Sequence, residues 1–260
     1  MLNFHNAGKP ICVITGGGKY DKKVISLDAD ADDKTYFNKL KISNDSKFCP
    51  VPNTKSEREI LYITGCSGSG KSTFTRMYLE QYKKKYKNRE IYMFSSLKED
   101  SSLDSIKPKR FIIDESLYTD PIKIEDLKDS VVIYDDIDVI SNKKIKDAVY
   151  DNLNQALEIG RHFGLTIVVT NHLPTNGIYT RRILNEASLI VYFPQSAGGK
   201  IKYLLSVYLD IDKKQIKYWK QCHTRWVCIG KNYKQYYITE HEVSVLNLDS
   251  ESENETDKHK

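Results

Sequence analysis

One segment of the chain, residues 65–72, restricts the possible fold more than any other. It reads GCSGSGKS and fits the pattern G-x-x-x-x-G-K-[ST] of a phosphate-binding loop. An apolar run, ILYIT at residues 60–64, precedes the loop, and an amphipathic stretch from Ser72 to about Lys87 follows it. A strand that enters such a loop and leaves it as a helix surrounds a phosphate with backbone N–H groups and a helix N-terminus. The segment therefore predicts a nucleotide-binding α/β fold.

The loop also predicts the cofactors, which are ATP and Mg²⁺. In this pattern the lysine, Lys71, reaches the β- and γ-phosphate oxygens and the serine, Ser72, binds Mg²⁺. The residues expected to hold the nucleotide are Gly65, Cys66, Ser67, Gly68, Ser69, Gly70, Lys71, Ser72 and Thr73. A second glycine-rich run, residues 16–19, lacks the Ser or Thr after its lysine and lacks a following helix. It indicates a hairpin turn between strands at 11–15 and 23–27.

Beyond the loop, apolar strand-like runs alternate with helical patterns. The strand-like runs lie at residues 91–94, 110–113, 131–134, 165–169 and 189–193, and the helical patterns at 143–162 and 179–187. This alternation predicts an α/β protein, a P-loop NTPase with a mostly parallel sheet covered by helices on both faces. Residues 200–245 add a helix and a hairpin of residues 225–229 with 235–239.

The chain has three predicted parts. Residues 1–57 form a β-rich N-terminal extension, with a small hairpin followed by a polar, turn-rich connector from residue 28 onward. Residues 58–245 form the P-loop ATPase domain with its C-terminal extension, and residues 246–260 form an acidic tail that we expect to be disordered. The net charge of +5 divides accordingly, because residues 249–260 carry −3 and the remainder +8. A basic body is compatible with a polyanionic partner.

Composition excludes several classes of protein. An apolar share of 40% is enough for a packed core, which excludes wholesale disorder. No apolar run approaches the roughly 18 residues of a membrane span, and the N-terminus lacks the pattern of a signal peptide. We therefore expect a soluble intracellular protein. The five cysteines form no C-x-x-C pair, which argues against a disulfide framework and, around Cys222, His223 and Cys228, against a zinc site.

Hydrolysis of a nucleotide requires a second strand that ends in acidic residues, one for Mg²⁺ and one for the attacking water. Two strand ends qualify, Asp114-Glu115 and Asp135-Asp136. The second is favoured, because a long helix follows it and then a strand that ends in the polar run of residues 170–172. A strand ending in an amide suits a sensor of the γ-phosphate. We predict Asp135 as the Mg²⁺ carboxylate and Asp136 as the base that polarises water.

The runs GCSGSGKST, VVIYDDID, GRHFGLTIVVTNH and RRILN…LIVYF together resemble the FtsK–HerA superfamily of DNA-pumping ATPases. Within it, the likeness is to the poxvirus-type genome-packaging ATPases of large DNA viruses and virophages. It covers residues 59–193 well and residues 225–239 more loosely. The resemblance implies an ASCE/RecA-like fold and a homo-oligomeric ring that hydrolyses ATP to thread double-stranded DNA into a capsid. It also implies sequence-independent contacts with DNA phosphates, a capsid or portal partner, and a location in the host-cell cytoplasm, the viral factory or the virion.

The resemblance assigns roles only where positions match. Lys71 and Ser72 would contact Mg-ATP, Asp135 the metal, and Asp136 would act as base where the wider superfamily commonly has glutamate. Asn171 stands where the superfamily often has a sensor glutamine. Arg161 matches the arginine before the sensor strand, and we expect it to enter the neighbouring subunit's site as an arginine finger. Arg181 and Arg182 are alternatives for that role.

Other functions remain open from the sequence. A nucleoside or nucleotide kinase uses the same loop, and a DNA-pumping ATPase can serve plasmid transfer or helicase work instead of packaging. A third alternative is an assembly module that holds ATP without hydrolysing it. Candidate DNA contacts are four basic stretches, each of which is more often a solvated surface, at residues 83–89, 107–110, 143–146 and 213–214.

Overall fold

The computed structural model describes residues 1–28, 35–52, 58–196, 199–231 and 234–246. The elements in chain order are β1 (Leu2–Asn3), β2 (Lys9–Gly16), β3 (Val24–Leu27), β4 (Lys39–Lys41), β5 (Ser46–Pro50), β6 (Ile60–Thr64), α1 (Lys71–Lys85), β7 (Ile91–Ser95), β8 (Lys109–Ile112), α2 (Ser116–Thr119), β9 (Val131–Tyr134), α3 (Lys143–Ile159), β10 (Thr166–Asn171), α4 (Ile178–Glu186), β11 (Leu189–Tyr192), α5 (Gly199–Tyr203), α6 (Lys213–Gln221), β12 (Val227–Gly230), β13 (Tyr236–Ile238) and β14 (Glu242–Val245). A π-helical segment, Leu204–Tyr208, continues α5.

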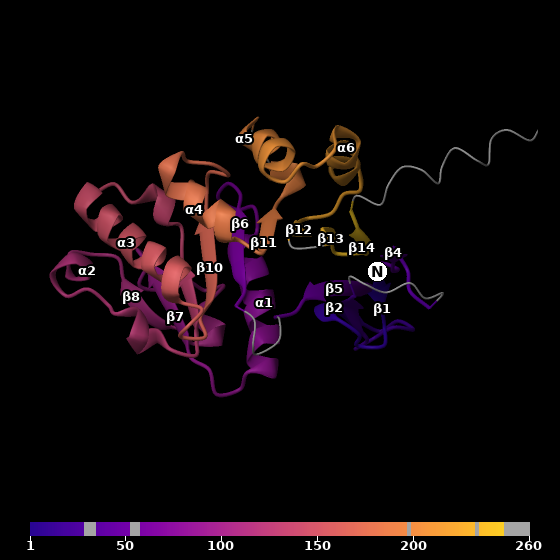
Figure 1. Cartoon of the computed structure of the whole chain (residues 1–260), viewed down its shortest axis with the longest axis horizontal. Helices are drawn as coiled ribbons and strands as arrows, with labels where there is room; N and C mark the ends of the chain where they lie inside the picture. Colours follow the sequence, from indigo (N-terminus) through magenta and orange to yellow (C-terminus); the bar gives the residue numbers. More distant parts are fainter. Residues whose placement is uncertain (29–34, 53–57, 197–198, 232–233, 247–260) are drawn as a thin grey trace, which may run out of the picture.

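A ten-stranded sheet runs through the middle of the molecule (Figure 1). Its strand order is β4-β14-β13-β12-β11-β6-β10-β9-β7-β8. The six strands from β11 to β8 are parallel to one another, and the other four extend the sheet in antiparallel fashion. The mostly parallel α/β sheet is therefore confirmed. Because β10 lies between β6 and β9, the order is that of an ASCE-type P-loop NTPase.

The parallel strands are buried on both faces, which explains why they read as continuous apolar runs. Along β6, Ile60 and Tyr62 point into a core shared with α3, α4 and α6. Leu61 and Ile63 point into a second core that is shared with α1. The loop that joins β6 to α1 therefore emerges between the two layers of helices, at the carboxyl edge of the sheet.

A small antiparallel sheet, with order β1-β3-β2-β5, covers the outer side of α1. Phe74 and Tyr78 of α1 share a core with Ile14 and Phe48 of this sheet. The predicted hairpin of β2 and β3 is confirmed by their antiparallel pairing. The segment expected to be a connector contains two further strands, β4 and β5. In β5, Phe48 and its neighbour Cys49 are buried, and β4 pairs with β14 of the central sheet.

The C-terminal region holds more structure than its sequence pattern indicated. The predicted hairpin is present as β12 and β13, with Cys228 opposite Ile238. Two helices replace the single one expected, and β14 adds a strand that the pattern did not reveal. Apart from Leu246, the predicted acidic tail lies outside the described residues. None of the described helices has the length and apolar character needed to cross a membrane.

Candidate active site

The glycine-rich loop closes tightly around the start of α1. Gly68 and Gly70 have φ angles of +75° and +110°, a backbone conformation that residues with a Cβ rarely adopt. A Cβ on Gly65 would lie 2.6 Å from Ser69 Oγ and 2.8 Å from Phe193 Cδ2. Three of the loop residues, from Cys66 to Gly68, are exposed and so accessible to a nucleotide. The loop therefore has the backbone geometry that its sequence pattern requires.

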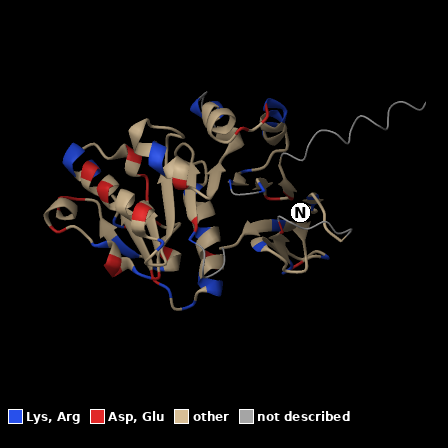
Figure 2. Ribbon diagram, viewed as in Figure 1, with Lys and Arg blue, Asp and Glu red and all other residues tan. Residues whose placement is uncertain are grey.

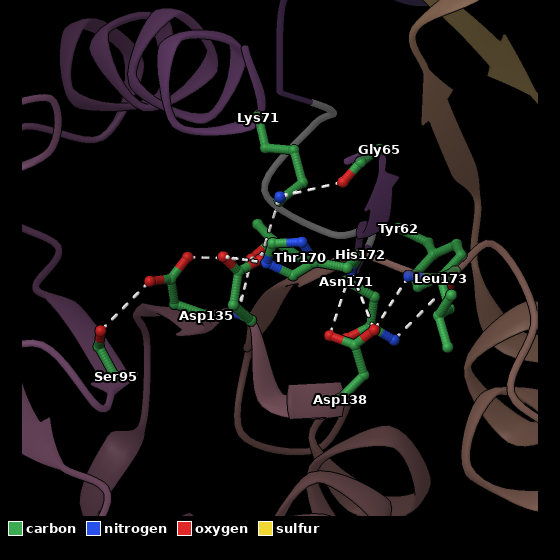
Figure 3. A network of polar contacts seen from close by, with 11 residues as sticks. Tyr62, Gly65, Lys71, Ser95, Asp135, Asp138, Thr170, Asn171, His172 and Leu173 are labelled. Atoms are coloured by element: carbon green, nitrogen blue, oxygen red, sulfur yellow. Dashed lines mark hydrogen bonds and ion pairs between the residues drawn. The ribbon is translucent and has the colours of Figure 1, made fainter. Parts of the chain in front are cut away.

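Lys71 joins the loop to the acidic strand end. Its side chain is buried, with 8% of its surface exposed. Its ammonium Nζ donates to the carbonyl of Gly65 at 3.0 Å (Figure 3). The same Nζ lies 3.4 Å from Oδ1 of Asp136. Ser72 and Thr73 follow in the first turn of α1, half-buried and exposed respectively. The lysine is thus held over the edge of the sheet at which β6, β9 and β10 end.

Asp135 directly follows β9 and is half-buried at this edge. Ser95 Oγ donates to its Oδ2 at 3.2 Å, and Thr170 Oγ1 donates to its Oδ1 at 2.9 Å. Burial, and then the neighbouring charge of Asp136, raise the pKa of Asp135 above its ordinary value, although both hydroxyls act in the opposite direction. A nearby cation would favour the ionised form of this carboxylate.

Asp136 is the central group of the cluster. Its backbone is left-handed, with φ of +47°, and its N–H donates to Thr170 Oγ1 at 2.8 Å. One carboxylate oxygen faces Lys71, and the other, Oδ2, lies 2.9 Å from Nε2 of His172. Asp136 is therefore held from three sides by groups of the loop and of the neighbouring strand.

Asp138 fixes the backbone that carries His172. Its buried carboxylate accepts from the backbone N–H of His172, at 3.0 and 3.1 Å, and from that of Leu173 at 2.9 Å (Figure 3). Hydrogen bonds from backbone N–H groups to a carboxylate are charge-assisted and stronger than neutral ones. The turn after β10 is therefore anchored to the turn after β9, and the imidazole is presented to Asp136.

The structure does not bring Asn171 to this cluster. Successive side chains of a strand point to opposite faces of the sheet. Thr170 faces Asp135 and Asp136, whereas Asn171 is fully buried and its Nδ2 lies 3.4 Å from Tyr62 Oη, on the face covered by α3 and α4. The side chains on the Asp136 side of the strand end belong to Thr170 and His172.

The alternative acidic pair lies elsewhere. Asp114 and Glu115 are exposed and follow β8, the edge strand, which β7, β9 and β10 separate from β6. The carboxylate of Asp114 accepts from the backbone N–H and the hydroxyl of Ser116, which lowers its pKa. These residues begin a short helix and are remote from the phosphate loop.

The candidate finger arginines lie away from the phosphate loop's edge of the sheet. Arg161 is at the opposite, amino edge, and Arg181 and Arg182 are in α4. Arg161 is exposed and lies between the end of α3 and the start of β10, near Arg58, which precedes β6. Arg182 lies 3.7 Å from Glu158 of α3. In the described part of the chain, no ion pair involves Arg161 or Arg181. Arg161 is thus at the amino edge, away from Lys71 of its own subunit.

Ser95, Asp138, Thr170 and His172 belong to the site and were not predicted as site residues. For His172 and Thr170 a signal was present, since both stand in the polar run after β10. A strand buried on both faces gives no alternation from which to decide which side chains face the loop. Ser95 is the last residue of β7, and nothing in its sequence context marks it as a site residue. It reaches Asp135 because β7 pairs with β9.

The cluster suits Mg²⁺ in the way that nucleotide sites commonly do. Mg²⁺ is usually held by one or two protein oxygens together with waters and substrate phosphates. Asp135 supplies a half-buried carboxylate beside a second carboxylate, and Ser72 supplies a hydroxyl at the start of α1. In the described ranges no three His, Cys, Asp or Glu side chains gather as a metal site. The residues therefore fit a cation that a nucleotide helps to hold.

Comparisons with known proteins agree with the fold and the loop. A protein-family model described as an AAA domain matches residues 54–123. The uncharacterized protein V3 of Sputnik virophage is 38% identical over 249 residues, which cover 95% of this chain and 99% of V3.

Among solved structures, the genome packaging NTPase B204 of Sulfolobus turreted icosahedral virus 2, in complex with AMPPCP, is 16% identical. It covers 70% of this chain and 97% of its own, with a TM-score of 0.47. EccC of Thermomonospora curvata is 12% identical over 94% of this chain and 41% of its own, with a TM-score of 0.46. The nearly full-length match to V3 shows the family: the chain belongs to the same family as the virophage protein V3, and its strand order and phosphate loop are those of a P-loop NTPase.

Proposed function

We propose that this chain is an ATP-hydrolysing motor that moves double-stranded DNA and packages a viral genome into a capsid. The observation that carries the ATPase part is the contact of Lys71 with Asp136, 3.4 Å apart, where β6, β9 and β10 end side by side. The packaging part is supported by the virophage relative and by the resemblance to packaging ATPases. The proposal includes the three predicted parts of the chain, with the ATPase domain at residues 58–245.

In this proposal the loop residues from Gly65 to Thr73 hold ATP. Backbone N–H groups of the loop and the N-terminus of α1 face the phosphates, and Lys71 exchanges Asp136 for phosphate oxygens. Asp135 and Ser72 hold Mg²⁺, which when bound neutralises negative charge on the β- and γ-phosphate oxygens. Burial of Lys71 strengthens its attraction to those oxygens.

Asp136 orients the attacking water and accepts its proton. The carboxylate is held by His172, whose Nε2 lies 2.9 Å from Oδ2, and by Thr170, whose hydroxyl lies 3.2 Å from Oδ1; the same hydroxyl accepts from the Asp136 backbone N–H at 2.8 Å. We assign the role of γ-phosphate sensor to these two residues in place of Asn171, because the Asn171 side chain lies on the other face of β10. A positioned base of this kind typically contributes about 10²–10⁴-fold to the rate.

The proposed motor is a homo-oligomeric ring. Arg161 lies at the amino edge of the sheet, so it can serve only the site of a neighbouring subunit, where it would stabilise charge on the transferred phosphoryl group. The partners in this proposal are double-stranded DNA, contacted through its phosphates, and a capsid or portal protein. Sequence-independent contacts suit a motor that must move along any sequence.

The experiment that tests the proposal is the rate of ATP hydrolysis with and without double-stranded DNA, for wild type and Lys71→Ala. We expect DNA to raise the wild-type rate, and Lys71→Ala to abolish hydrolysis. Phosphorylation of a nucleoside without stimulation by DNA would establish a kinase instead. An absence of phosphate release under both conditions would establish a nucleotide-holding module. DNA uptake into capsids separates packaging from plasmid transfer or helicase work.

A further inference from the structure

A groove lined mainly by lysines lies between α6 and α5 with its π-helical continuation. Its cavity has a volume of about 430 Å³. Four of its six lining residues are lysines, and no acidic residue lines it: the residues are Lys202, Ser206, Lys213, Ile216, Lys217 and Lys220. In Figure 2 the ribbons of both helices carry blue segments, which mark Lys and Arg. We propose that this groove binds the phosphate backbone of double-stranded DNA, an assignment that rests on the proposed function.

The lysines of α6 form a fixed array. Lys213, Lys217 and Lys220 have the spacing i, i+4, i+7 and so share one face of the helix. The other side is anchored by Trp219, which is fully buried and makes edge contacts with Tyr192 and Tyr237 at centroid distances of 6.0 and 5.1 Å. Because Trp219 fixes the rotation of the helix, the three ammonium groups are presented together toward the groove.

These lysines are not neutralised within the described part of the chain. All four lining lysines are exposed, and no ion pair there involves any of them. Like charges four residues apart on a helix repel each other and disfavour the helix. A polyanion would relieve this repulsion, and its displaced counterions would add to the affinity. The array therefore favours a ligand with several closely spaced negative charges.

The shape of the array suits a duplex backbone. Seven residues of helix span about 10 Å, and duplex DNA carries one charge per about 1.7 Å of its axis, so several phosphates lie beside the helix. Lysine is a point charge on a flexible stem and does not read base edges as a planar group does. The groove would therefore bind duplexes without regard to sequence, as the proposed motor requires.

The groove is also linked to the phosphate loop by direct contacts. β11 ends beside the loop, where Phe193 lies so close to Gly65 and Gly70 that a Cβ on these glycines would be 2.8 and 3.4 Å from its ring. Two residues later, the side-chain amide of Gln195 donates to the carbonyl of Lys220 at 3.0 Å. The segment of residues 193–195 therefore connects the phosphate loop with α6.

The test compares duplex binding by the full chain and by the triple variant K213E/K217E/K220E, with a fluorescent duplex of random sequence followed by anisotropy over a salt series. We expect the variant to lose at least tenfold in affinity and its slope of log K against log salt to fall by about three. Its basal ATP hydrolysis and thermal midpoint should stay as in wild type. A neutral variant, K213Q/K217Q/K220Q, should lose less affinity than the charge reversal.

A matched control, K84E/K87E/K144E, makes the same change of charge at exposed lysines in the last turn of α1, just after that helix, and in α3. We expect it to bind the duplex within about twofold of wild type at physiological salt, where exposed charges farther apart than the Debye length are screened. Equal losses in both triple variants, or none in the groove variant while wild type binds, would overturn the groove assignment alone. Failure of wild type to bind a duplex would overturn the proposed function with it. Cross-linking of the groove lysines to residues 247–260, with duplex affinity unchanged in the groove variant, would assign the groove to the chain's own acidic tail.

Discussion

The imidazole Nε2 of His172 lies 2.9 Å from Oδ2 of Asp136, whose other oxygen lies 3.4 Å from Nζ of Lys71. The carboxylate is therefore held between the residue that contacts phosphate and a residue of the neighbouring strand end. Asp138 accepts from the backbone N–H of His172 and so fixes the backbone that carries the imidazole. This arrangement makes His172 a positioning residue for the proposed base.

Replacing His172 by alanine should lower turnover while leaving nucleotide binding intact. Misplacement of a catalytic group by about 1 Å can cost about 100-fold in rate, so we expect kcat for ATP to fall by about 10- to 100-fold. The KM for ATP should change little, because His172 touches the base and not the loop. His172→Gln, which keeps a donor near the same place, should recover part of the loss. An unchanged kcat with a raised KM would contradict the positioning role.

The sensor assignment can be tested with two neighbouring residues that face opposite ways. Thr170→Val keeps the shape of the side chain but removes the hydroxyl that lies 2.9 Å from Asp135 and 3.2 Å from Asp136. We expect it to lower kcat by about tenfold or more, because the two carboxylates share the single proton of this hydroxyl and the Asp136 backbone N–H donates to its oxygen. Asn171→Ala should mainly lower the thermal midpoint, since the side chain is fully buried against Tyr62. Steady-state kinetics and thermal melts of both variants distinguish the roles, and the reverse pattern would restore Asn171 as the sensor.

The sequence was sufficient for the order of the central elements but not for the direction of side chains at their ends. The loop, β9 and the helix α3 begin where their patterns predicted, since glycines, apolar runs and helical spacing are local signals. Whether Thr170 or Asn171 faces the phosphate loop depends on how β10 sits between β6 and β9, and both of its faces are apolar. The pairing of β4 with β14 joins residues about 200 positions apart and leaves no local pattern at all.

The buried carboxylate of Glu242 joins β4 of the N-terminal segment to the C-terminal helix and strands through ion pairs and hydrogen bonds. Tyr218 and Tyr237 donate to its carboxylate, and Lys39 and Lys41 of β4 lie 3.0 and 3.1 Å from it. Burial by itself would raise the pKa of Glu242, but these four partners outweigh burial and hold the pKa below its ordinary value of 4.5. The ionised form therefore stabilises the folded state.

We expect Glu242→Gln to lower the free energy of unfolding by about 1–3 kcal/mol at pH 7, because charge-assisted hydrogen bonds are lost in a buried place. Since the pKa is lowered in the folded state, this stabilisation is complete above pH 4.5 and is lost as the pH falls through the lowered pKa. Urea unfolding of both proteins should thus give a difference at pH 7 that shrinks progressively below pH 4.5. A difference that stays constant down to pH 3 would show that the charge of Glu242 is not its source.

The placement of Arg161 predicts that two inactive variants restore activity when mixed. Helix α3 runs from the carboxyl edge of the sheet, near Asp136, back to the amino edge, and its 17 residues span about 25 Å, so Arg161 cannot reach Lys71 of its own subunit. Lys71→Ala subunits keep the arginine, and Arg161→Ala subunits keep a working loop. Lys71→Ala alone should not hydrolyse ATP, and Arg161→Ala alone should do so slowly. A mixture should exceed both, because an intact loop then meets an intact arginine at some interfaces. Arg182→Ala, which breaks the contact of 3.7 Å with Glu158, should retain activity alone and serves as the control. A mixture no more active than the separate variants would remove the support for a finger acting between subunits.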